Sequence, residues 1–86
     1  MKRIIDVSSD ESGLDSLLGE RITLFCMNYI YTGVLTSVNH TFVLLTDASV
    51  VYETGAFTEP AWKDAQALPN DLYIMLSAVE SFCCLK

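Results

Sequence analysis

Residues 17–52 read LLGERITLFCMNYIYTGVLTSVNHTFVLLTDASVVY, and this stretch decides the fold. Near its start, Ile22, Leu24 and Cys26 alternate with neighbours of a different character. A period of two is typical of a β-strand with two unlike faces, because successive side chains point to opposite sides. The stretch therefore begins with a predicted strand that has one face turned to a core.

Two further runs rich in β-branched and aromatic residues follow the first strand. One covers residues 31–38, and the other begins at 41 and can continue to 52. Gly33 lies inside the middle run, where a glycine usually marks a sharp bend or a close backbone approach. Asn28-Tyr29 is predicted to form the first tight turn, because Asn tolerates positive φ. The stretch thus predicts a three-stranded antiparallel meander with a bent middle strand.

A short helix is predicted before the meander. Leu14, Leu17 and Leu18 share one face at helical spacing, and Gly19 is a credible C-terminal stop. A helix of about two turns is marginal alone, so it must pack on the sheet.

The segment after the meander changes in character. Thr58 followed by Pro60 resembles a helix start with Pro at an early position, which predicts a short helix or an irregular excursion. Beyond it, residues 72–76 read LYIML and residues 79–86 alternate, which indicates two more strands. We expect one domain divided into an arm (1–8), a helix (9–19), three strands (20–52), a variable insertion (53–70) and two last strands (71–86).

Composition limits the classes of partner. The chain has 86 residues, of which 51% are hydrophobic and 19% are charged. Such an apolar excess in so small a domain indicates that some of it is buried between subunits. The net charge of −6 argues against a general phosphate-binding surface, which needs clustered cations. Any nucleic-acid site must then be local and depend on stacking or backbone groups.

The order of these features resembles the first signature of the Sm and Sm-like (LSm) RNA-binding family. The matching elements are Leu17-Leu18-Gly19, Ile22-x-Leu24-x-Cys26, Gly33-Val34-Leu35, Val38-Asn39-His40 and Asp47-Ala48. The resemblance covers roughly half of the chain, and it implies a mainly β fold. We therefore expect a small, five-stranded, strongly bent antiparallel barrel, SH3-like in plan and Sm-like in detail, with a short N-terminal helix.

The resemblance also implies a homo-oligomeric ring in which the fourth strand of one subunit pairs with the fifth strand of the next. The family's usual rings have six or seven members, so the resemblance implies roughly five to eight subunits here. A head-to-tail contact closes whenever its rotation divides the circle. The residues expected at the subunit interface are Leu72, Ile74, Leu76, Val79, Ser81, Phe82 and Cys83.

The resemblance further implies binding of single-stranded RNA, or of DNA, in a role such as RNA processing. The loop around His40 is the best candidate, because His can stack on a base and Asn can bond its edge. The residues expected to bind nucleic acid are Ser37, Asn39, His40, Thr41 and Ser77. The alternative is an ordinary polar hairpin loop, whose turn composition alone explains Asn and Ser.

A second alternative concerns the whole ring. The family has Ile-Arg-Gly at the end of the fourth strand, where this chain reads Ile74-Met75-Leu76. The arginine that packs on a bound base is therefore absent here. A structural or protein-interaction ring that binds no nucleic acid stays open beside the RNA-binding ring.

Other chemistry finds little support in the sequence. The one His has no carboxylate partner specified nearby, and no Ser-His-Asp set, phosphate loop or metal-ligand spacing is present. We therefore expect no enzyme activity, no cofactor and no metal.

The cysteines are read as buried hydrophobes in a reducing compartment, which predicts a cytoplasmic protein without a membrane segment. Trp62 is expected either to stack on a ligand or, preferably, to pack beneath a lid.

Overall fold

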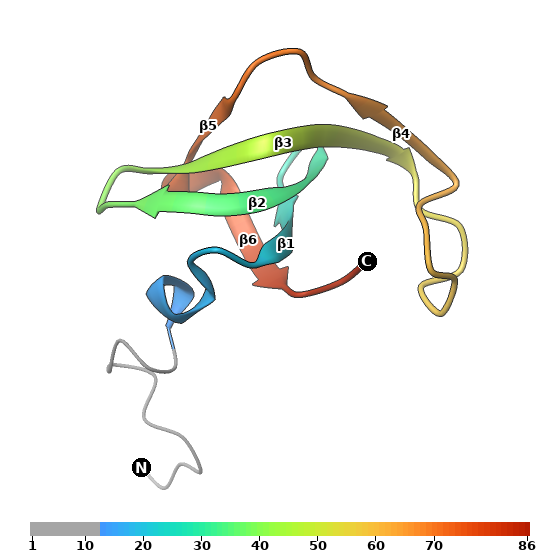
Figure 1. The fold of residues 1–86 in the computed structure, drawn as a ribbon, viewed down its shortest axis with the longest axis horizontal. Coiled ribbons are helices and arrows are strands. Elements are labelled where there is room, and N and C mark those ends of the chain that lie inside the picture. Colours follow the sequence, from blue (N-terminus) through green and yellow to red (C-terminus); the bar gives the residue numbers. More distant parts are fainter. Residues whose placement is uncertain (1–12) are drawn as a thin grey trace, which may run out of the picture.

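A computed structural model describes residues 13–86 as one bent antiparallel sheet (Figure 1). The hydrogen-bonded order is β4-β3-β2-β1-β6, and β5 also pairs with β3. β3 therefore has β2 on one side and, on the other, β4 and β5 in succession. The elements are η1 (Leu14–Leu17, a 3-10 helix), β1 (Arg21–Cys26), β2 (Ile30–Val38), β3 (Phe42–Glu53), β4 (Asp64–Ala67), β5 (Leu72–Met75), η2 (Leu76–Ala78, a 3-10 helix) and β6 (Val79–Cys83).

The sheet bends where Gly33 meets β3. The β2–β3 register shifts between Thr32 and Val34, and Asp47 adopts a φ of 50°. A Cβ atom on Gly33 would lie 3.0 Å from the Thr46 carbonyl oxygen and 3.2 Å from the Ala48 Cα. A side chain at this position would require the neighbouring backbone to shift, so glycine is favoured here. The prediction of a close approach at Gly33 is confirmed, and so is the mainly β, strongly bent antiparallel class.

The core lies inside this bend. Thr23 and Thr32 are buried in it beside the apolar side chains, and each hydroxyl donates a hydrogen bond to a backbone carbonyl. Thr32 Oγ1 donates to the Ile22 carbonyl at 3.0 Å, and Thr23 Oγ1 donates to the Leu85 carbonyl at 2.7 Å. These bonds remove the penalty of burying a hydroxyl. The buried apolar residues are Ile22, Leu24, Leu35, Val43, Leu45, Ala48, Val51 and Ile74.

The predicted insertion contains a strand that the sequence analysis missed. β4 lies within residues 53–70 and pairs with the C-terminal half of β3, so the described sheet has six strands rather than five. Of the two alternatives predicted after Thr58, the irregular excursion is the one present, because turns and bends precede β4. Pairing with the open edge of β3 outweighs the weak helical preference of the short Ala-Gln-Ala run. Pro69, which has no N–H to donate, then separates β4 from β5.

The predicted N-terminal helix is not confirmed. The arm 1–8 and the first residues of the predicted helix lie outside the described residues. Within residues 13–86, the predicted helix is reduced to the single 3-10 turn η1. Leu14 and Leu17 pack against the core, but Leu18 is 50% exposed, so the predicted three-leucine face is wrong at Leu18. Gly19 ends the turn with a φ of 88°, as predicted.

The first tight turn also differs from its prediction by one residue. The Cys26 N–H donates to the Tyr29 carbonyl at 3.0 Å, which makes Met27 and Asn28 the turn residues. Asn28 does not adopt a positive φ, so the physical reason given for the turn does not apply. In residues 13–86, no helix has the length and apolar character needed to cross a membrane.

Candidate ligand-binding rim at the β2–β3 and β5–β6 connections

Two connections that are far apart in sequence meet at one end of the sheet. The β2–β3 loop covers residues 39–41, and η2 joins β5 to β6. The Leu76 N–H donates to the Thr41 carbonyl at 2.8 Å, directly beside the paired residues Phe42 and Met75. We call this junction of residues 39–41 and η2 the rim. A backbone hydrogen bond between the two connections fixes their relative position.

Asn39 builds the first half of the rim. Its side-chain Oδ1 accepts the Thr41 N–H at 2.8 Å and the Phe42 N–H at 2.9 Å. This is an Asx turn, for which asparagine is a preferred residue. The turn therefore explains Asn39 without any ligand, although the amide N–H groups of its side chain take no part in these two bonds. Ser37 and Val38 belong to β2, so the loop itself is limited to residues 39–41.

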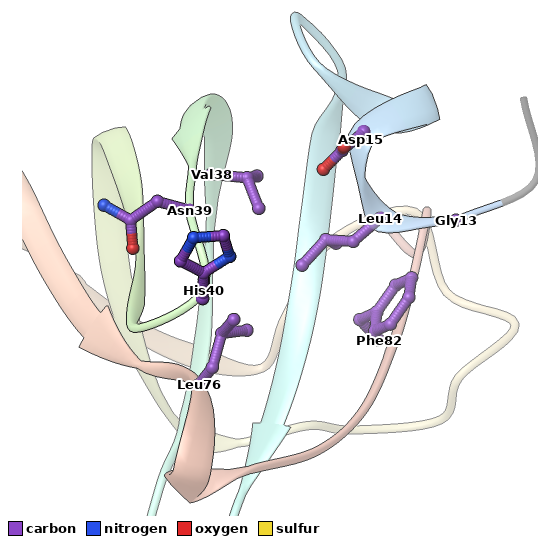
Figure 2. Close-up of a pocket in the computed structure, with 8 residues that line it drawn as sticks. All are labelled: Gly13, Leu14, Asp15, Val38, Asn39, His40, Leu76 and Phe82. Atoms are coloured by element: carbon purple, nitrogen blue, oxygen red, sulfur yellow. The ribbon is translucent and has the colours of Figure 1, made fainter. Parts of the chain in front are cut away.

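His40 borders a cavity of about 770 Å³. Figure 2 shows the side chains of His40 and Leu76 on one side of this cavity, and those of Leu14 and Phe82 on the other. Apolar walls with a few polar groups are typical of small-ligand sites, and His40 offers a ring that a base can stack upon. The lining residues are Gly13, Leu14, Asp15, Val38, Asn39, His40, Leu76 and Phe82.

The structure brings together only part of the predicted nucleic-acid site. Asn39 and His40 share the cavity, whereas Ser37, Thr41 and Ser77 are exposed and do not line it. Leu14 and Phe82 complete the walls, and the sequence analysis assigned neither of them to this site. They come from the two ends of the described chain, so no local motif could have joined them to His40.

Charges on the described chain do not favour a phosphate contact. Arg21 forms an ion pair with Asp47, and Lys63 pairs with Glu53 at 3.3 Å. Lys86 Nζ donates to three backbone carbonyls, those of Thr54, Ala56 and Ala61. Each cation of residues 13–86 is therefore already engaged, and Asp15 is the one carboxylate of the cavity lining.

β5 presents one face to the core and the other to solvent. Ile74 is only 5% exposed and its side chain belongs to the chain's own core, so any part it takes in a subunit interface is through its backbone. Leu72 is half-buried against the same core. Tyr73 and Met75 point the other way and are 62% and 52% exposed. The LYIML run is apolar throughout, so its sequence has no alternation that distinguishes the buried face of the strand from the exposed face.

β6 is largely exposed, as β4 is. Ser81, Phe82 and Cys83 are exposed, whereas Val79 and, just before it, Leu76 are half-buried. Within the described sheet β6 pairs with β1 alone and β5 pairs with β3 alone. Each of these two strands therefore has one unpaired edge, with exposed apolar side chains beside it.

The rim offers little chemistry beyond binding. Among residues 13–86, no three His, Cys, Asp or Glu side chains gather closely enough to hold a metal ion. Burial, and to a smaller extent the Glu80 carboxylate, raises the pKa of the Cys26 thiol, which keeps this thiol protonated and weakly nucleophilic near neutral pH. Trp62 lies in the loop before β4, half-buried against Phe57.

The sequence has no match among protein-family models, and no curated protein matches it either. A solved structure does match: the crystal structure of a heptameric archaeal Sm protein, at a TM-score of 0.65 and 15% sequence identity. The likeness covers 85% of this chain and 96% of that protein. At such low identity it concerns the fold, and its extent over both chains shows that this chain has the Sm fold.

Proposed function

We propose that this protein assembles into a homo-oligomeric ring by strand addition. The observation that carries the proposal is that the unpaired edges of β5 and β6 each lie next to large exposed apolar side chains. β4 also has an unpaired edge, but its residues read DAQA and offer no large apolar side chain. Such edges promote aggregation unless another chain covers them. Pairing β5 of one subunit with β6 of the next satisfies both edges and buries Tyr73, Met75 and Phe82. The heptameric assembly of the similar archaeal Sm protein supports this arrangement.

The ring in this proposal has roughly five to eight members, a range that includes the heptamer of the similar archaeal Sm protein. A head-to-tail contact closes at any number whose rotation divides the circle. It acts in the cytoplasm, without a membrane partner. The three cysteines are free thiols in the structure, which suits a reducing compartment, but Cys83 and Cys84 are exposed and Cys26 is half-buried, so the prediction of buried cysteines is wrong.

We further propose that the rim binds single-stranded RNA, or DNA, without catalysis. His40 supplies a stacking surface, the Asn39 amide supplies hydrogen-bond donors, and the apolar walls exclude water from a bound base. One such contact is weak, but a ring repeats it once per subunit. Linked weak sites gain affinity through their high effective concentration, so a strand that spans several subunits binds tightly enough to matter.

A second candidate function follows from the charges. Because each cation of the described chain is already engaged, phosphate receives no obvious partner at the rim. A ring that serves as a structural or protein-interaction module, with no nucleic-acid ligand, is consistent with this observation. The two candidates make the same prediction for assembly and opposite predictions for oligonucleotides.

The test measures the fluorescence anisotropy of labelled oligo-U, oligo-A and oligo-dT with purified protein. RNA binding predicts saturable binding with a shallow salt slope, because few cations contact phosphate. His40→Ala should weaken it about tenfold, the cost of losing roughly one stacked base. Asn39→Asp keeps the oxygen that closes the Asx turn and removes the amide donors. A loss of binding in this variant is therefore due to the lost ligand contact and not to a disrupted turn.

Tyr52→Ala is the matched control, since Tyr52 is an exposed aromatic residue far from the rim. No binding to any of the three oligonucleotides at low salt rejects the nucleic-acid function and leaves the structural ring. Equal losses for His40→Ala and Tyr52→Ala would mean that binding does not use the rim.

A further inference from the structure

Backbone carbonyls of the loop between β3 and β4 accept all the hydrogen bonds that one lysine side chain can donate. Lys86 Nζ donates to the Thr54 and Ala56 carbonyls at 2.9 Å each and to the Ala61 carbonyl at 3.1 Å. A lysine ammonium has three donors and no acceptor. These three carbonyls therefore satisfy its full hydrogen-bonding capacity without a carboxylate.

Two aromatic rings of the same loop flank this ammonium. Lys86 Nζ lies 4.5 Å from the centroid of the Trp62 ring and 5.9 Å from that of Phe57. The two rings meet edge to face, with centroids 6.5 Å apart and planes at 90°. An ammonium over an aromatic face is attracted by the ring quadrupole, and Trp gives the strongest such contact. Carbonyls and rings together form a binding site that matches a primary ammonium in charge, donor number and size.

We propose that residues 54–62 form an ammonium-binding site whose ligand in this chain is Lys86. We call it the ammonium cage, made of the carbonyls of Thr54, Ala56 and Ala61 and the rings of Phe57 and Trp62. Its ligand class is a primary alkylammonium. The neighbouring Lys63 does not occupy it, because Lys63 Nζ pairs with Glu53 at 3.3 Å.

The position of the cage gives it a structural consequence. β4 and β6 are the two outermost strands in the order β4-β3-β2-β1-β6. Lys86 follows β6, and the cage lies just before β4, so the contact joins the two ends of the sheet (Figure 1). Phe25 of β1 also contacts Phe57, with ring centroids 6.5 Å apart. The ammonium therefore closes the bent sheet at a place where the strands themselves do not pair. The ammonium cage requires neither a ring nor nucleic acid.

Trp62 is the only tryptophan of the chain, so its fluorescence reports directly on the cage. We expect Lys86→Met, which keeps length and removes charge, to shift Trp62 emission to longer wavelength and to increase quenching by acrylamide. The equilibrium constant for closing the loop should fall roughly tenfold. This is the scale of a partly desolvated cation–π contact. Lys63→Met is the matched control, and it should leave both signals unchanged, because Lys63 binds outside the cage.

A second measurement keeps the test decisive if the loop opens altogether. n-Butylammonium, added to Lys86→Ala, should bind saturably and restore the wild-type Trp62 signal, while n-butanol should not. The wild-type protein should not respond, because Lys86 already fills the site. Unchanged emission in Lys86→Met, or an n-butylammonium response that is absent in Lys86→Ala or equal in the wild type, would overturn the proposal. Far-ultraviolet circular dichroism verifies that each variant retains its sheet.

Discussion

Strands β1 to β3 contribute far more to the hydrophobic core than strands β5 and β6 do. Seven of the eight buried apolar side chains come from β1, β2 and β3, and Ile74 is the one that comes from the C-terminal pair. The first group therefore packs mainly on itself. β5 and β6 add little to the core, and each keeps an open edge. The difference indicates that stability is concentrated in the first half, while the second half retains apolar surface for another subunit.

The largest expected effect separates the two regions directly. Leu45→Ala removes a fully buried side chain of β3 and should lower the free energy of unfolding by about 2–5 kcal/mol. Met75→Ala, on the exposed face of β5, should cost less than about 0.5 kcal/mol in dilute, unassembled protein. Urea denaturation at several protein concentrations measures both. A Met75→Ala cost as large as that of Leu45→Ala at high dilution would contradict the division.

Gly33 tests whether the bend belongs to the first region. Gly33→Val forces a side chain toward the Thr46 carbonyl and the Ala48 backbone, so it should destabilise the fold by about 1–3 kcal/mol. Ser37→Val on the same strand is the control, because Ser37 is exposed and valine suits a strand. Equal melting temperatures for Gly33→Val and the wild type would show that the bend does not need glycine.

A smaller effect distinguishes the two rim residues. Asn39→Ala removes the acceptor of two backbone N–H groups and should cost about 1 kcal/mol, the net value of a typical hydrogen bond. His40→Ala should leave stability unchanged, since His40 is exposed. Thermal unfolding of the two variants checks this difference. If His40→Ala proved the more destabilising, His40 would be part of the fold rather than a free stacking surface.

The sequence predicted the strands whose signals are local. Alternation at Ile22, Leu24 and Cys26 identified β1, and the glycine at 33 identified the bend. β4 was missed because its preference is weak and its pairing with β3 is a tertiary contact. The buried position of the Ile74 side chain was not predictable, because a continuous apolar run has no period.

The candidate site was predictable to a smaller extent. Asn39 and His40 are adjacent in sequence, so their loop was identified, but Leu14 and Phe82 reach the same cavity only after folding. The contact between Lys86 and Trp62 joins residues that are distant in sequence, and no sequence motif predicts it. In both cases the missing information was the path of the backbone, which sets residues that are distant in sequence beside one another.

The central claim is that the open edges of β5 and β6 pair between subunits. Met75→Lys combined with Phe82→Lys places like charges beside these edges and should disperse the assembly. Tyr52→Lys is the matched control, because Tyr52 is equally exposed but lies on β3, which has neighbours on both sides.

Light scattering on the purified protein at micromolar concentration is the most direct measurement. The account predicts a wild-type mass of roughly five to eight subunits. Tyr52→Lys should keep this mass, and the Met75→Lys/Phe82→Lys protein should remain folded with a monomer's mass. A wild-type protein that is folded and monomeric at this concentration would contradict the ring and, with it, the argument that repeated weak sites bind nucleic acid.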